Sequence, residues 1–168
     1  MALDPATLDA LTTRREDLAA RRIRPDGQRP RSTARGVHHV ALISSDVERT
    51  VEFFDGLLEF PLIEMFENRD YAGSTHFFFD IGEGNALAYF DLPGLDLGPY
   101  AEVLGGHHHL AISVERPQWE RLKAKLEAAG VESAHVDGSS LYFRGPDGER
   151  LELISDPLGE MYGRTLGH

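Results

Sequence analysis

The stretch VHHVALIS occupies residues 37–44, and a related stretch, HHHLAISV, follows 70 positions later at residues 107–114. The two stretches match nearly residue for residue, and each contains a run of aliphatic residues that is typical of a β-strand. An internal repeat of this kind indicates two copies of one structural unit in the chain. The rest of the sequence can therefore be compared copy by copy.

The segments that follow the two stretches have the same order, a helix and then three strands. Asp46 caps the first predicted helix, Pro117 opens the second, and Gly130 ends it. The predicted strands are residues 37–43, 60–66, 75–81 and 86–92 in the first copy, and 107–114, 131–136, 140–144 and 150–154 in the second. The sequence therefore predicts an α+β fold of two tandem βαβββ modules, residues 36–92 and 106–157, whose sheets join around a shared cleft.

The first 35 residues differ from the rest in charge. They hold eight arginines and five carboxylates, a formal charge of +3, so the remaining residues carry −14 and the whole chain −11. Asp4 and Pro5 are typical of a helix start, and residues 24–35, rich in Pro, Gly and Arg, are expected to form an extended arm. Two roles fit this arm: a clamp across an acidic partner subunit, or an extension packed on its own domain. The predicted divisions are residues 1–35, a central domain at 36–157 and a tail at 158–168.

Composition limits the class of protein. The 168 residues are 41% apolar and 27% charged, which is ordinary for a globular protein. A net charge of −11 argues against nucleic acid and anionic membrane as partners, because both attract basic surfaces. The absence of cysteine excludes disulfides and a cysteine nucleophile, and it leaves imidazole and carboxylate as metal ligands. No apolar run approaches about 18 residues and the N-terminus lacks an apolar signal core, so we expect a cytoplasmic protein.

Three positions related by the repeat carry metal-ligating side chains. His39 and His109 occupy the same place in the two first strands, and Glu152 lies in the last strand of the second copy, where the first copy has Ala88. Two imidazoles and one carboxylate suit a divalent first-row metal with open coordination positions. The sequence therefore predicts a metal site of His39, His109 and Glu152, with Fe(II) as the expected ion and Mn, Zn or Ni as alternatives. In the competing interpretation, the histidines are hydrogen-bonded core residues and Glu152 lies at a surface edge.

The other histidines of the repeat receive structural assignments. Neighbours on a strand point to opposite faces, so His38 and His108 are expected to face the helices. His107 comes two residues before His109, on the same predicted face, and is expected at the rim of the site.

The chain resembles the vicinal oxygen chelate superfamily, which includes glyoxalases, extradiol dioxygenases, fosfomycin-resistance enzymes and bleomycin-binding proteins. The resemblance covers residues 36–157 and is strongest in HVAL at residues 39–42 and DVERTVEFF at residues 46–54. It implies a U-shaped sheet cavity around a divalent metal that is bound from the first and last strands of each module. It also implies a homodimer, because small chains of this fold usually pair. Ala88 argues against glyoxalase-type isomerases, which use a fourth protein ligand at that position.

The end of the second module resembles the signature of extradiol dioxygenases. The match runs from His135 to Tyr142, continues with a Pro-Asp-Gly turn at residues 146–148 and ends at Glu152. The resemblance implies that Tyr142 hydrogen-bonds a metal-bound oxygen and that His135 orients the substrate or moves protons. Asn85 stands near the place of a further acid–base histidine in those enzymes, and an amide there can hydrogen-bond dioxygen or substrate without transferring protons.

We predict a metal-dependent, dioxygenase-like enzyme that oxidises or cleaves a small aromatic, catechol-like or vicinal-oxygen substrate, with O2 as its second substrate. Two alternatives keep the same metal: a glyoxalase-like lyase and a fosfomycin-type thiol transferase. The transferase needs cationic groups for a phosphonate, and Arg144 and Arg150 are the nearby candidates. The non-enzymatic alternative is a resistance protein that binds a small aromatic molecule. Aromatic residues that either line a pocket or serve as sheet packing are Phe66, Phe77, Phe79, Tyr89 and Phe143.

Overall fold

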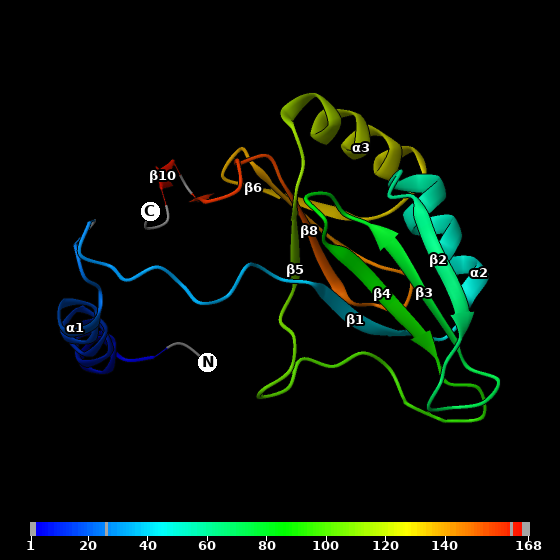
Figure 1. Cartoon of the computed structure of the whole chain (residues 1–168). Coiled ribbons are helices and arrows are strands. Elements are labelled where there is room, and N and C mark those ends of the chain that lie inside the picture. Colours follow the sequence, from blue (N-terminus) through cyan, green and yellow to red (C-terminus); the bar gives the residue numbers. More distant parts are fainter. Residues whose placement is uncertain (1–2, 26, 162, 166–168) are drawn as a thin grey trace. The chain divides into compact units, whose positions relative to one another are not determined.

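The protein forms two compact units. The computed structural model describes residues 3–25, 27–161 and 163–165 (Figure 1). Among the described residues, one unit runs from Gly36 to Arg164, and the other holds those before Gly36 together with Thr165. No helix in the described residues has the length and apolar character needed to span a bilayer.

The N-terminal unit is built on helix α1 (Pro5–Arg22). Asp4 caps this helix, because its carboxylate accepts a hydrogen bond from the backbone N of Thr7 at 3.1 Å, and Pro5 occupies the first turn. Residues 23–25 and 27–38 then run without helix or strand, as their Pro- and Gly-rich composition predicts.

The larger unit repeats one order of elements, which confirms the α+β fold and the two βαβββ modules. The first module contains β1 (His39–Ser44), α2 (Val47–Val51), η1 (Glu52–Leu57), β2 (Leu62–Glu67), β3 (Thr75–Asp80) and β4 (Ala86–Asp91). The second contains β5 (Leu110–Ser113), α3 (Arg116–Ala128), β6 (Ser133–Val136), β7 (Ser140–Arg144) and β8 (Arg150–Ile154). A short pair of strands follows, β9 (Glu160–Met161) and β10 (Arg164–Thr165). The π-helical turn η1 continues α2, which Asp46 caps by accepting a hydrogen bond from the backbone N of Arg49 at 3.0 Å.

Each module forms a four-stranded sheet, and the two sheets have the same topology: β1-β4-β3-β2 and β5-β8-β7-β6. In both sheets the first and last strands run parallel, and the other neighbours run antiparallel. Ala41 lies opposite Ala88 in the first sheet, and Ala111 lies opposite Glu152 in the second. Because Ala41 and Ala111 are themselves 70 positions apart, Ala88 and Glu152 occupy equivalent places, as the repeat predicts.

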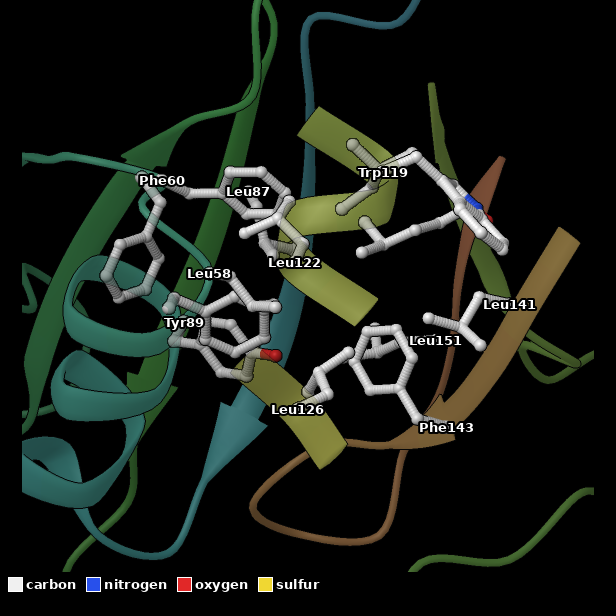
Figure 2. Close-up of a cluster of buried hydrophobic side chains, with 14 of the residues drawn as sticks. Leu58, Phe60, Leu87, Tyr89, Trp119, Leu122, Leu126, Leu141, Phe143 and Leu151 are labelled. Carbon is white, nitrogen blue, oxygen red and sulfur yellow. The ribbon is translucent and has the colours of Figure 1, made fainter. Parts of the chain in front are cut away.

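One hydrophobic core joins the two modules. Helix α3 contributes Trp119, Leu122 and Leu126, which lie between side chains of the first module and side chains of the second (Figure 2). The first module adds Phe54, Leu58, Phe60, Phe77, Phe79, Leu87 and Tyr89, and the second adds Ile112, Leu141, Phe143, Leu151 and Leu153. Each large apolar side chain that is fully buried stabilises the fold by roughly 1.5–3 kcal/mol. Each sheet therefore has one face on the common core, and its alternate residues lie on the opposite face, the open face.

The turn between β7 and β8 fastens the second module to the first. Asp147 accepts hydrogen bonds from the backbone N of Ser45 at 3.1 Å and from the guanidinium of Arg49 at 2.7 Å. Glu149, which is 4% exposed, accepts a hydrogen bond from the hydroxyl of Tyr89 at 2.8 Å. The predicted Pro-Asp-Gly turn is thus a contact between modules as well as a strand connection.

Candidate metal centre

Two of the three predicted metal ligands lie together on the open face of the second sheet. His109 immediately precedes β5 and Glu152 lies on the neighbouring strand β8, with His109 Nε2 3.1 Å from Glu152 Oε2. Glu152 is only 3% exposed, although it stands between Leu151 and Leu153. Two ligands bound to one ion at about 2.0–2.2 Å lie about 3 Å apart, so this pair fits adjacent positions on a divalent metal.

Tyr142 lies beside the two ligands. The register of the β7–β8 hairpin places it directly opposite Glu152, and its ring centroid is 5.5 Å from that of His109. The hydroxyl-bearing ring is therefore on the same face as the ligand pair. The spacing of Tyr142 and Glu152 in the sequence follows from this pairing in the hairpin. A hairpin with the same register in any other protein has the same spacing, so the spacing is not specific to dioxygenases.

The third predicted ligand lies on the other sheet. His39 starts β1, and its ring centroid lies 6.3 Å from that of Phe78 on the open face of the first sheet. Among the residues that the structure describes, no three His, Asp or Glu side chains come together as a metal site. One chain therefore brings His109 and Glu152 together and keeps His39 apart from them.

Each ligand histidine contacts the histidine before it. Nδ1 of His39 lies 2.9 Å from Nδ1 of His38, and Nδ1 of His109 lies 2.7 Å from Nδ1 of His108. These contacts leave Nε2 of His39 and His109 as the nitrogen that can bind a metal. The prediction that His38 and His108 face the helices is wrong: both are exposed, because they precede the strands and do not follow the strand alternation.

Burial favours the neutral form of two further histidines. Both ring nitrogens of His107 are buried without a hydrogen-bond partner, and burial lowers the pKa of His107, with added contributions from His109 and His108. Nε2 of His76 is likewise buried without a partner, and burial, followed by the charge of His39, lowers the pKa of His76.

The open face of the first sheet is aromatic. His76 stacks on Phe90 with ring centroids 3.7 Å apart, and the rings of Phe78 and Phe66 lie 4.2 and 5.3 Å from that of His76. Along their strands these residues alternate with core residues, as Ala88 does. This alternation is the sequence signal that places them on the open face. The core instead takes the other candidates for an aromatic pocket, Phe77, Phe79, Tyr89 and Phe143.

Two predicted catalytic residues do not face the ligand pair. His135 lies opposite Leu141, on the helix side of the second sheet, and its ring centroid is 5.0 Å from that of Trp119. Asn85 lies in the turn before β4, where its amide donates a hydrogen bond to the backbone O of Gly82 at 3.1 Å. We therefore leave both residues out of the candidate site, since His135 is on the other face and Asn85 stabilises a turn.

Two arginines share the open face of the second sheet. Arg144 lies directly opposite Arg150. Arg144 is two residues from Tyr142 on β7, and Arg150 is two residues from Glu152 on β8. Both guanidinium side chains line a hollow of about 500 Å³, together with His108 and Tyr142. Arg150 also forms an ion pair with Glu102 at 3.0 Å. Glu132 also lines this hollow, so the two guanidinium groups and one carboxylate leave it with a net positive lining that is suited to an anionic group.

The family model of the Glyoxalase/Bleomycin resistance protein/Dioxygenase superfamily matches residues 36–153. The chain belongs to this superfamily. Metallothiol transferase FosB of Shouchella clausii is 29% identical over 133 residues, which cover 74% of the chain and 83% of that protein. The ring-cleaving dioxygenase candidate MhqA of Bacillus subtilis is 25% identical over 138 residues, which cover 76% of the chain and 42% of MhqA. The crystal structure of fosfomycin resistance protein FosX from Mesorhizobium loti matches with a TM-score of 0.58 and 22% identity, covering 75% of this chain and 95% of that one.

Membership confirms the resemblance to the vicinal oxygen chelate superfamily. The relatives are named as enzymes, which supports an enzyme of this superfamily. The FosB match spans most of both proteins, whereas the MhqA match covers less than half of MhqA. The comparisons therefore give the transferase alternative more support than the dioxygenase prediction.

Proposed function

We propose that this superfamily member is a divalent-metal-dependent transferase, which adds a thiol to a small anionic substrate with neighbouring oxygen atoms. The observation that carries the proposal is the pair of His109 and Glu152 at 3.1 Å, with Tyr142 and two arginines on the same face. The similarity to FosB supports the reaction class, because that relative is named a metallothiol transferase.

The proposed ligands are His39, His109 and Glu152, with His39 supplied by a second copy of the chain. A single chain holds His39 on one sheet and the other two ligands on another, so a dimer is needed to complete the set. Mn²⁺, Zn²⁺, Ni²⁺ and Fe²⁺ all accept imidazole and carboxylate ligands. When bound, the ion supplies a Lewis acid that polarises a substrate oxygen.

The side chains around the two ligands have distinct roles in the proposed reaction. Arg144 and Arg150 bind the anionic group, because guanidinium forms paired hydrogen bonds with phosphonate or carboxylate oxygens. Tyr142 donates a hydrogen bond to the substrate oxygen nearest Glu152. The thiolate sulfur forms a C–S bond as the adjacent C–O bond breaks, and the released oxygen takes a proton from water.

Metal titration and thiol consumption test the proposal. The chain loaded with Mn²⁺ or Zn²⁺ is expected to consume cysteine or glutathione in the presence of fosfomycin, and mass spectrometry should detect the adduct. His109→Ala is expected to lose metal binding and turnover, whereas His135→Asn retains both. A chain that binds no divalent metal, or that binds one yet forms no adduct with any thiol tested, contradicts the proposal.

A dioxygenase is the second candidate, because Tyr142 faces Glu152 and because part of MhqA matches the chain. With Fe²⁺ loaded anaerobically, this candidate predicts O2 uptake and a yellow ring-fission product from a catechol panel, without a thiol adduct. We rank it second because the amide of Asn85 is bound into its turn and cannot transfer protons.

A further inference from the structure

Four side chains form one line of close polar contacts that ends at the candidate metal centre. Arg150 NH1 lies 2.9 Å from His108 Nε2, and His108 Nδ1 lies 2.7 Å from His109 Nδ1. His109 Nε2 in turn lies 3.1 Å from Glu152 Oε2. One end of the line is a guanidinium, which can only donate, and the other is a carboxylate, which accepts when ionised.

These two ends determine where the imidazole protons lie in the metal-free chain. Because Arg150 donates, His108 Nε2 must accept, and a neutral His108 then carries its proton on Nδ1. His108 therefore donates to Nδ1 of His109, which carries its own proton on Nε2, the nitrogen that lies 3.1 Å from Oε2 of Glu152. Both hydrogen bonds of His108 therefore run in one direction, from the guanidinium of Arg150 toward His109.

A metal on His109 is incompatible with that direction. Metal binding needs the lone pair of Nε2, so the proton of His109 must lie on Nδ1. His109 then donates to His108 Nδ1, and the proton of His108 moves to Nε2. Two donors, His108 Nε2 and the guanidinium of Arg150, would now face each other.

We propose that His108 is a positioning residue whose tautomer reverses when the candidate centre takes up metal, and that this reversal releases Arg150. The inference rests on the proposed metal site. The carboxylate of Glu102 is placed to stabilise the reversed tautomer. Its Oε2 lies 4.0 Å from His108 Nε2, which then carries the proton, and its Oε1 lies 3.0 Å from the guanidinium of Arg150. The NH1 of Arg150 is then free to donate into the hollow that it lines, where the anionic substrate is proposed to bind.

Nitrogen NMR of the histidines tests the reversal directly. At about pH 8, where imidazole is neutral, two-bond ¹H–¹⁵N spectra distinguish Nδ1–H from Nε2–H rings, and His108→Asn assigns the signals of His108. We expect an Nδ1–H ring for His108 in the metal-free chain and an Nε2–H ring after Zn²⁺ is added. A His108 ring that keeps one tautomer throughout while Zn²⁺ binds overturns the inference and leaves the proposed function standing. A chain that binds no Zn²⁺ overturns both.

Affinity measurements give an independent readout. Arg150→Met removes the donor that holds His108 in the metal-free tautomer, so Zn²⁺ should bind about five- to tenfold more tightly, the equivalent of one hydrogen bond. Arg144→Met is the matched control, because it removes the same charge from the opposite position without a contact to His108. Equal effects of the two variants would overturn the inference, as charge alone would then explain them. In the His108→Ala background, the advantage of Arg150→Met over Arg144→Met should disappear.

Discussion

Glu152 is a nearly fully buried carboxylate on a strand of leucines, and such a group is unfavourable unless a partner stabilises it. In the metal-free chain that partner is His109 at 3.1 Å. An exposed, single ion pair would carry little functional information, but this one joins two side chains that the repeat already marks as candidate ligands. The burial of Glu152 and its contact with His109 therefore favour the role of a metal ligand over that of a surface carboxylate.

Glu152→Gln is expected to weaken Zn²⁺ or Mn²⁺ binding by at least about 100-fold, because even residues that only support a ligand commonly change metal affinity about 10–100-fold. The amide has nearly the shape and volume of the carboxylate, so the metal-free variant should unfold at nearly the wild-type temperature. Isothermal titration calorimetry and thermal melting measure the two effects.

The control for this variant is His135→Asn, since His135 lies beside Trp119 on the other face of the sheet. It should leave the metal affinity unchanged. A large loss of affinity in His135→Asn, or an unchanged affinity in Glu152→Gln, would contradict the proposed ligand set.

The pH dependence of stability should reflect Glu149. Burial raises the pKa of Glu149 above its ordinary value of 4.5, so the folded chain holds this proton more tightly than the unfolded chain. Glu149 therefore contributes most stability below about pH 4.5, and this contribution is lost as pH rises through the raised folded value. Glu149→Gln cannot titrate, so its melting temperature relative to wild type is expected to rise with pH. Scanning calorimetry from acidic to mildly alkaline pH measures this difference, with the exposed Glu132→Gln as a control that should run parallel to wild type.

At the scale of elements, the turn between β7 and β8 has a steric requirement at Gly145. A Cβ added there would overlap the carboxylate of Glu149, which is hydrogen-bonded to Tyr89 across the module boundary. Gly145→Ala is therefore expected to displace Glu149 and to lower the free energy of unfolding by about 1–3 kcal/mol. Urea denaturation measures the change.

Gly56 provides the matched control for Gly145. A Cβ at Gly56, in η1, would meet nothing within 4 Å, so Gly56→Ala is expected to be neutral or to stabilise by about 0.5–1 kcal/mol. If both alanine variants lose the same stability, the contact between the turn and the first module is not what makes Gly145 necessary.

The elements also show which features the sequence could predict. Alternating aliphatic and aromatic residues predicted the strands to within a few residues, and the repeat predicted the equivalence of Ala88 and Glu152. The face of His135 was not predictable from the spacing of a signature. It depends on the turn at residues 137–139, which pairs Val136 with Ser140 and thereby places His135 opposite the buried Leu141.

At the scale of the whole molecule, the repeat predicts two equivalent modules around a shared cleft, but it does not predict whether one chain or two chains close that cleft. Both modules place their other faces on one core, which fixes the ligand-bearing faces on separate sheets. That is the physical reason why His39 could be predicted as a ligand from the sequence but is not joined to Glu152 within one chain. The proposed dimer resolves this by using the same two faces, one from each copy.

Mixed dimers can decide between a site shared by two copies and a site within one chain. His39→Ala and Glu152→Gln homodimers are each expected to lose metal binding, because every site lacks one ligand. A dimer of one chain of each kind should regain one of its two sites in the shared arrangement, since one site then combines the intact His39 of one copy with the intact His109 and Glu152 of the other. Two affinity tags isolate the mixed dimer after the two variants are unfolded and refolded together, and titration with Zn²⁺ measures its stoichiometry. Recovery of one ion per mixed dimer supports the shared site, whereas no recovery is the result required by a site within one chain, where both copies are defective.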